Sequence, residues 1–308
     1  MKKQIAGALL GLTILGTALP TQNVEAAGSK HKLTSTEQKA LFFSDLVYEV
    51  PKEESKDVSD MGIQKSKSYS DFRKEISENL PKGMSFTSFY DKAGLKNYRM
   101  MDLVRQTDKY PQLDDKIKGT GVVVRAFYDK TGKSPTFMAI KGTSNGWDVI
   151  EDLEILNHRQ ITNFYNKKSF NQLHAIATLY VLNDDAMKKK SKQPIILTGH
   201  SLGGRNANFF GMVAKIKAIT FAAPQYRYND ASEVRKFVKK QQKSYSYKKN
   251  ITNFQHDRDS ITWLPPVPLV DIDYIPGTTY TYSDGFKKPV SMKYHQIKSY
   301  YKRVPYKK

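Results

Sequence analysis

Short apolar runs in the second part of the chain have the length and composition of β-strands. Residues 121–128 and 136–140 are rich in β-branched and aromatic side chains, and the Asp-Lys-Thr-Gly stretch at 129–132 between them is typical of a turn. This pattern predicts a hairpin. The apolar run at 194–198 is predicted to be a short buried strand, and 216–221 is predicted to be the next strand.

Helical patterns occupy the segments around these strands. Thr34-Ser35-Thr36-Glu37 is a capping-box sequence, which predicts the start of an apolar-rich helix that extends to Val47. Residues 170–180 place apolar side chains at helical spacing, and another apolar helix is predicted around 209–213. The alternation of strands and helices is typical of an α/β protein with a mostly parallel central sheet that helices cover on both faces.

The first residues have the pattern of a secretory leader. Lys2 and Lys3 precede an uncharged apolar run at 5–19, and small residues follow at the two positions that a signal peptidase reads, Val24 and Ala26. We therefore expect a signal peptide at 1–26, a secreted protein, and one catalytic domain at 27–308. The alternative is an uncleaved anchor, although the run is short for a bilayer span of roughly 20 residues.

Composition narrows the function classes. The chain has no cysteine, which excludes disulfides, thiolate metal sites and a cysteine nucleophile.

The formal net charge of the chain is +20, with lysine clusters at 188–190, 235–249 and 287–308. A basic surface attracts anionic membranes or cell-wall polymers, so peripheral contact with such a surface, and retention there, is one expectation. The other expectation is that the lysines only form a solvated basic surface. We expect no nucleic-acid partner, because no nucleic-acid-binding motif occurs.

The sequence Gly199-His200-Ser201-Leu202-Gly203-Gly204 lies between a predicted buried strand and a predicted helix. A serine between two glycines in this context predicts a nucleophile elbow. The sharp turn forces the serine into a strained backbone conformation, and side chains on the flanking glycines would collide with the neighbouring strand and helix. The serine is lifted clear of the sheet, and the positive end of the helix points at the site. Ser201 is therefore the candidate nucleophile.

A serine hydroxyl needs a base to take its proton and an acid to orient that base. In the α/β-hydrolase fold both residues follow the serine, and the acid comes first. His295 lies near the C-terminus beyond several acids, so it fits this order better than His256. Spacing leaves five aspartates open as the acid: Asp257, Asp259, Asp271, Asp273 and Asp284.

The negative oxygen that forms during acyl transfer needs two donors. One is expected to be the backbone N–H of Leu202, directly after the nucleophile, and the other comes from a loop after an earlier strand. The segment 141–144 follows the predicted strand 136–140 and is the natural candidate. Thr143 in this segment could add its hydroxyl.

Several sequence blocks, taken in order, resemble the class 3 (fungal-type) lipase family and its bacterial relatives. The blocks are 139–143 with Trp147 and Asp152, 199–204, 220–224, 253–266, and His295 with Tyr300. An elbow alone occurs in many hydrolases, but the ordered set is specific to this family.

The resemblance implies an α/β-hydrolase fold with Ser201 as nucleophile, Asp259 as acid and His295 as base. It also implies that Thr143 and Leu202 form the oxyanion hole. The function that follows is hydrolysis of carboxylic esters, most simply lipid acyl esters, through an acyl-enzyme, without metal or organic cofactor. The sequence does not separate a lipase from a phospholipase A1 or a small-ester esterase. The alternative from another class is an inactive basic surface-binding protein with the same fold.

Overall fold

The computed structural model describes residues 31–49, 69–101, 124–142, 194–224, 246–259, 261, 277–283 and 291–304. The predicted leader at 1–26 and the predicted helix at 170–180 lie outside these residues.

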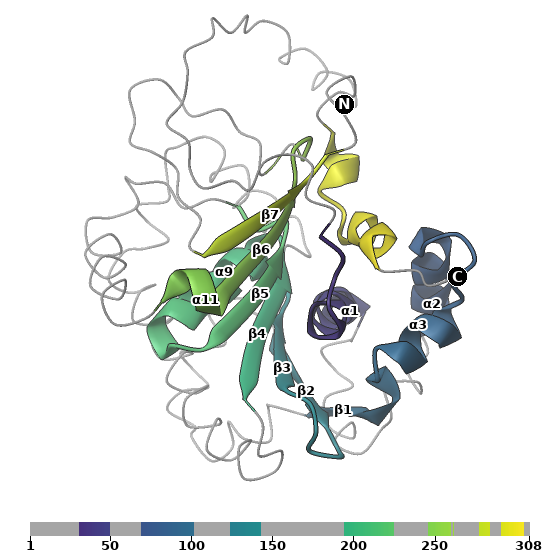
Figure 1. Cartoon of the computed structure of the whole chain (residues 1–308), viewed down its shortest axis with the longest axis horizontal. Coiled ribbons are helices and arrows are strands. Elements are labelled where there is room, and N and C mark those ends of the chain that lie inside the picture. Colours follow the sequence, from purple (N-terminus) through teal and green to yellow (C-terminus); the bar gives the residue numbers. More distant parts are fainter. Residues whose placement is uncertain are drawn as a thin grey trace, which may run out of the picture.

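A single sheet of seven strands forms the centre of the described structure, with the strands in sequence order (Figure 1). The strands are β1 (Tyr98–Met101), β2 (Val124–Asp129), β3 (Thr136–Ile140), β4 (Ile195–His200), β5 (Lys217–Phe221), β6 (Ile251–His256) and β7 (Thr278–Tyr282). β1 to β3 are antiparallel, whereas β3 to β7 are parallel. The sheet is thus mostly parallel, as predicted.

The predicted hairpin is confirmed in β2 and β3, which pair with Val124 opposite Ile140. Its turn is organised by Asp129, whose carboxylate accepts hydrogen bonds from the backbone N–H groups of Thr131 and Ser134, both at 2.9 Å. An aspartate at this position satisfies the turn's own backbone donors, which is why the Asp-Lys-Thr-Gly sequence forms a turn.

Helices cover both faces of the sheet, as predicted. The helical segments are α1 (Ser35–Glu49), α2 (Tyr69–Asn79), α3 (Phe86–Lys92), η4 (Leu95–Asn97), α9 (Leu202–Ala214), α11 (Tyr247–Asn250), η5 (Met292–Tyr294) and η6 (Ile297–Arg303). α1 packs against one face over β3 to β5, and α9 packs against the other face over β4 and β5 (Figure 1). Among the described residues, no helix is long and apolar enough to cross a membrane.

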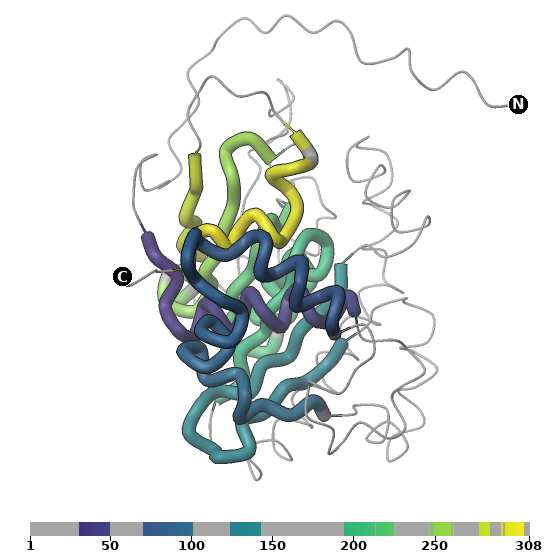
Figure 2. Tube along the Cα trace, turned by 90° about the vertical axis from the view of Figure 1, so that its right-hand side faces the viewer, coloured from purple at the N-terminus to yellow at the C-terminus, as the bar shows by residue number. Residues whose placement is uncertain are grey.

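α1 begins with the predicted capping box: Thr34 Oγ1 accepts from the Glu37 N–H at 3.3 Å, and the Glu37 carboxylate accepts from the Thr34 N–H at 2.7 Å. The helix is then buried on nearly all sides, because α2 and α3 cover the face turned away from the sheet (Figure 2). Phe43 stacks on Phe127 of the sheet, with ring centroids 4.4 Å apart. A helix between two layers needs apolar residues around most of its circumference.

The aromatic side chains of α2 and α3 gather around Phe42 on the opposite side of α1. They are Phe72, Phe86, Phe89 and Tyr90, with ring centroids 5.4 to 6.4 Å from that of Phe42. The core therefore continues outward from the sheet and holds the middle of α1, whose last residues reach the edge of the site described next.

Candidate active site

Ser201 lies between the end of β4 and the start of α9, as the elbow pattern predicts. Its backbone has φ 55° and ψ −132°, a conformation that non-glycine residues rarely adopt. Two backbone hydrogen bonds hold it there: Ser201 N–H donates to the Phe221 carbonyl at 3.0 Å, and the Ser201 carbonyl accepts from Arg205 N–H at 3.1 Å. Such strain costs on the order of 1–3 kcal/mol and persists only where the surroundings impose it.

The two glycines of the elbow allow α9 to approach the sheet closely. A Cβ atom at Gly199 would lie 2.5 Å from the carbonyl of Gly203, and one at Gly203 would lie 2.8 Å from the backbone nitrogen of Gly142. Both distances are far below van der Waals contact and both involve backbone atoms, which cannot turn aside. Glycine is therefore required here so that β3, β4 and α9 meet behind Ser201.

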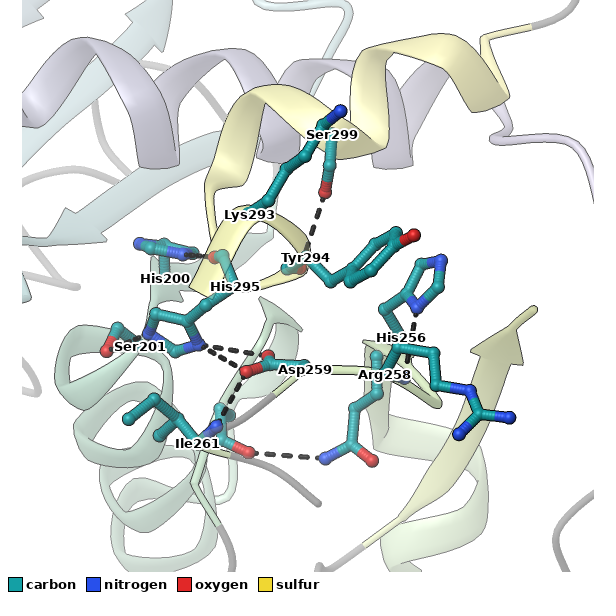
Figure 3. A network of polar contacts seen from close by, with 12 residues as sticks. His200, Ser201, His256, Arg258, Asp259, Ile261, Lys293, Tyr294, His295 and Ser299 are labelled. Carbon is teal, nitrogen blue, oxygen red and sulfur yellow. Dashed lines mark hydrogen bonds and ion pairs between the residues drawn. The ribbon is translucent and has the colours of Figure 1, made fainter. Parts of the chain in front are cut away.

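A chain of hydrogen bonds joins Ser201, His295 and Asp259 (Figure 3). Ser201 Oγ lies 2.8 Å from His295 Nε2, and His295 Nδ1 lies 2.9 Å and 3.0 Å from the two carboxylate oxygens of Asp259. All three residues are buried. The carboxylate can only accept, so Nδ1 carries the imidazole proton and Nε2 is left to accept from the serine hydroxyl. This is the arrangement in which a serine is activated as a nucleophile.

The topology brings these residues together from distant parts of the chain. Ser201 directly follows β4, and Asp259 comes three residues after the end of β6. The carboxyl ends of parallel strands meet at one edge of a sheet, so both side chains lie at that edge. An isolated parallel bridge pairs Asp259 with Ser291, and Ser291 N–H donates to the Arg258 carbonyl at 2.9 Å. This bridge fixes the segment that carries His295 beside the acid.

Asp259 is also held by the backbone around it. Its own N–H donates to the His256 carbonyl at 3.1 Å, and its carboxylate accepts from Ile261 N–H at 2.8 Å. Together with the hydrogen bonds to the His295 ring, these contacts hold the Asp259 carboxylate in a single orientation.

The other candidates occupy different places. His256 Nδ1 lies 3.1 Å from the carboxylate of its neighbour Asp257, and its ring stacks on Tyr294 with centroids 4.1 Å apart. Figure 3 shows His256 on the other side of Asp259 from Ser201. Thus the structure places His295, with Asp259, at the serine. Asp271, Asp273 and Asp284 lie outside the described residues.

Of the two predicted oxyanion donors, the structure describes one. Leu202 is the first residue of α9, where backbone N–H groups have no partner within the helix. The positive end of the helix dipole adds to its capacity to stabilise a negative oxygen. Thr143 lies outside the described residues, and the preceding Gly142 is the last described residue of that segment.

His200 has contacts that sequence reasoning missed, because it was treated only as part of the elbow motif. Its Nε2 lies 2.6 Å from the backbone carbonyl oxygen of His295, and its Nδ1 lies 3.1 Å from the hydroxyl of Tyr48. Burial, with a smaller effect from the neighbouring His295, lowers the pKa of His200 to about 3. The ring is therefore neutral at ordinary pH. The position of His200 next to Ser201 in the sequence indicates that it lies at the site, but no sequence pattern indicates Tyr48.

Among the described residues, no group of three or more acidic or histidine side chains is arranged to hold a metal ion. The chemistry available to the described site is that of an activated serine beside a helix N-terminus.

The comparisons with known proteins agree with this geometry. Residues 137–269 match the family model described as lipase (class 3), a range that begins in β3 and includes both Ser201 and Asp259. Over this range the chain is similar to the class 3 lipases. It is thus a serine ester hydrolase of the lipase type. His295 lies beyond the matched range, and no curated protein sequence matches the chain.

Solved lipase structures resemble the chain at low identity. A mutant form of MDLA from Penicillium cyclopium is 11% identical, with 84% of this chain and 83% of that chain covered and a TM-score of 0.46. The lipase from Rhizopus microsporus var. chinensis is 14% identical, with coverages of 88% and 84% and a TM-score of 0.43. The mono- and diacylglycerol lipase from Aspergillus oryzae is 16% identical, with coverages of 57% and 70% and a TM-score of 0.35.

Proposed function

We propose that this protein is a secreted class 3 lipase that hydrolyses lipid acyl esters through an acyl-enzyme formed on Ser201. The observation that carries the proposal is the hydrogen-bonded series of Ser201 Oγ, His295 and Asp259, with separations of 2.8 Å and 2.9 Å. A serine, a histidine and a buried carboxylate in this order are suited to nucleophilic acyl transfer.

In the proposed reaction, His295 Nε2 takes the hydroxyl proton while Ser201 Oγ forms a bond to the ester carbonyl carbon. The carbonyl oxygen becomes negative and accepts from Leu202 N–H and from Thr143. When the carbonyl re-forms, the bond to the alcohol oxygen breaks, and His295 returns the proton to the departing alcohol. Water then repeats the sequence on the acyl-enzyme, which releases the fatty acid and restores Ser201.

Asp259 acts on His295 in this scheme. It holds the ring in the tautomer with the proton on Nδ1 and stabilises the imidazolium that forms after proton transfer. His200, which is neutral because its pKa is about 3, adds no competing positive charge beside that imidazolium.

Labelling with a fluorophosphonate, which reacts with activated serines, tests the proposal. We expect the wild-type protein to be labelled on the peptide that contains Ser201, and Ser201→Ala to lose both the label and the hydrolysis of acyl esters. A panel of esters that differ in acyl length and headgroup then identifies the substrate. Preference for short soluble esters would indicate a carboxylesterase, and a wild-type protein that reacts with neither probe nor ester would contradict the proposal.

Secretion and surface contact are part of the same proposal. The leader pattern at 1–26 supports export, and the net charge of +20 supports peripheral contact with anionic membranes or wall polymers. Co-sedimentation with vesicles that contain anionic lipid should weaken as salt rises, because exposed charges are screened over about 10 Å at 0.1 M ionic strength. Equal binding to neutral vesicles would remove charge from the explanation.

A further inference from the structure

The hydroxyl of Tyr48 reaches the catalytic edge from α1, a helix that contributes no other side chain to the contacts around Ser201 described above. Tyr48 is the last but one residue of α1 and is partly buried. Its oxygen lies 3.1 Å from the backbone nitrogen of Gly142 and 3.1 Å from His200 Nδ1. Gly142 immediately precedes Thr143, and His200 immediately precedes Ser201. The Tyr48 oxygen therefore connects Gly142, which precedes the proposed oxyanion donor, with His200, which precedes the nucleophile.

The donors and acceptors of this network can be assigned. The His295 carbonyl oxygen only accepts, so the neutral His200 ring carries its proton on Nε2 and donates it there at 2.6 Å. His200 Nδ1 is then an acceptor for the Tyr48 O–H, with the His200 carbonyl at 3.3 Å as a second acceptor. The Tyr48 oxygen in turn accepts from Gly142 N–H. Each contact has one donor and one acceptor, so the network is internally consistent.

His200 keeps this arrangement over the range in which an esterase works. Its ring would need a second proton to reverse the contact with Tyr48, and its depressed pKa of about 3 prevents this near neutral pH. The same ring is bonded to the backbone of His295, whose side chain contacts Ser201. Tyr48 and His200 together thus touch the three segments that bear the nucleophile, the base and the residue before Thr143.

Packing around Gly142 shows how narrow this region is. A Cβ atom added at Gly142 would lie 2.6 Å from the His200 carbonyl oxygen and 3.4 Å from the backbone nitrogen of Gly203. The end of β3 therefore lies directly against the elbow. The Tyr48 hydroxyl is a side-chain partner of the Gly142 N–H, and without it this segment loses a tether at its closest approach to Ser201.

We propose that Tyr48 is a positioning residue, whose hydroxyl holds the segment before Thr143 at a fixed distance from Ser201 through its contacts with Gly142 and His200. The inference rests on the proposed function, because it assigns Tyr48 a part in stabilising the oxyanion. In the contacts described above, Tyr48 bonds to neither Ser201 Oγ nor the His295 ring. A displacement of a catalytic group by about 1 Å can cost roughly a hundredfold in rate, so a tether of this kind has a measurable effect.

The test is Tyr48→Phe, which removes the hydroxyl and keeps the ring. The matched control is Tyr98→Phe, because Tyr98 on β1 also donates a hydroxyl hydrogen bond, at 2.8 Å to the Pro135 carbonyl, but near the opposite end of β3. We expect Tyr48→Phe to lower kcat roughly ten- to a hundredfold with little change in KM, since the tether acts on the transition state. Tyr98→Phe should keep kcat within about twofold of wild type.

A second readout separates positioning from general loosening of the fold. n-Butylboronic acid forms a tetrahedral adduct with an active serine and places a negative oxygen in the oxyanion hole. Its affinity should fall for Tyr48→Phe by about the same factor as kcat/KM, and should be unchanged for Tyr98→Phe. Thermal unfolding of both variants records any loss of stability.

The inference is overturned if Tyr48→Phe turns over like wild type, if only KM changes, or if both variants lose activity in proportion to their melting temperatures. These outcomes are distinct from failure of the proposed function. If the proposed function failed, the wild-type protein would be inactive or Ser201→Ala would remain active, and neither result depends on a tyrosine variant.

Discussion

The aspartates of the pairs His295–Asp259 and His256–Asp257 lie two residues apart just after β6, yet the two pairs are built differently. In the first pair, the partners are 36 residues apart and the aspartate side chain is completely buried. In the second, they are neighbours in sequence, and the aspartate side chain is 20% exposed. His295 presents its second ring nitrogen to Ser201, whereas the ring of His256 stacks on Tyr294.

The difference shows that a histidine beside a carboxylate is not enough for catalysis. His256 Nδ1 also accepts a hydrogen bond from Arg258 N–H at 3.1 Å, so it cannot at the same time hold a proton for Asp257 in the neutral ring. His295 has no such conflict: its two nitrogens have separate, complementary partners. We infer that His295 is the base and that His256 is a packed residue beside the site.

Replacing the two histidines by alanine tests this comparison with the largest expected effect. His295→Ala should lower kcat for an acyl ester by about 10⁶-fold, because loss of the base removes the activation of Ser201. His256→Ala should keep kcat within about tenfold, with the main cost in stability through the lost stack on Tyr294. The measurement is steady-state hydrolysis of a nitrophenyl ester by both variants. Greater loss in His256→Ala would reverse the assignment of the base.

Replacing the two aspartates by asparagine tests the comparison with the next largest expected effect on kcat. Asp259→Asn should lower kcat about 10⁴-fold while leaving the fold intact, because an amide in this position favours the wrong tautomer of His295. Asp257→Asn is its matched control, two residues away and partly exposed, and should change kcat less than tenfold. Circular dichroism establishes that both variants are folded. Comparable kcat values for the two variants would show that Asp259 does not orient His295.

Another buried aspartate, Asp45, separates effects on stability from effects on catalysis. Asp45 on α1 touches neither histidine pair in the contacts described, and burial raises its pKa to about 7, although the positive charge of Lys298 and a hydrogen bond from Tyr301 oppose the shift. The folded-state pKa is higher than the value of 3.8 expected on unfolding, so the native protein binds an extra proton between these values. The stability present below about pH 4 is therefore lost as pH rises to about 7.

Asp45→Asn should remove this dependence. We expect the variant to be more stable than wild type by roughly 1–3 kcal/mol at pH 8, with the difference shrinking below pH 4, because the amide has no proton to lose. Its kcat should equal that of wild type. Urea unfolding at pH 4, 6 and 8 measures the effect, and parallel stability curves for the two proteins would show that Asp45 does not titrate as described.

Local patterns predicted much of the central fold. The hairpin, β4, β5 and the capping box each depend on neighbouring residues, and the structure confirms them. β1 was not anticipated: its four residues follow directly on η4 and are too few to show a period. A strand of this length is defined by its pairing with β2, which no local pattern records.

The candidate site divides in the same way. Ser201 is marked by glycines that are adjacent in sequence, so local physics indicates it. Spacing alone left the acid open, because the bridge between Asp259 and Ser291 is a long-range contact. The contact between Tyr48 and His200 joins residues 152 positions apart, and a tyrosine near the end of a helix carries no sign of it.

Trapping the acyl-enzyme tests the central claim most directly, namely that Ser201, activated by His295 and Asp259, attacks the ester. The protein is mixed rapidly with a nitrophenyl ester, quenched in acid, digested and analysed by mass spectrometry. We predict an acyl group on the Ser201 peptide in wild type and in His256→Ala, and none in His295→Ala on the same timescale. Turnover without any acyl adduct, or an adduct on another side chain, would contradict the account.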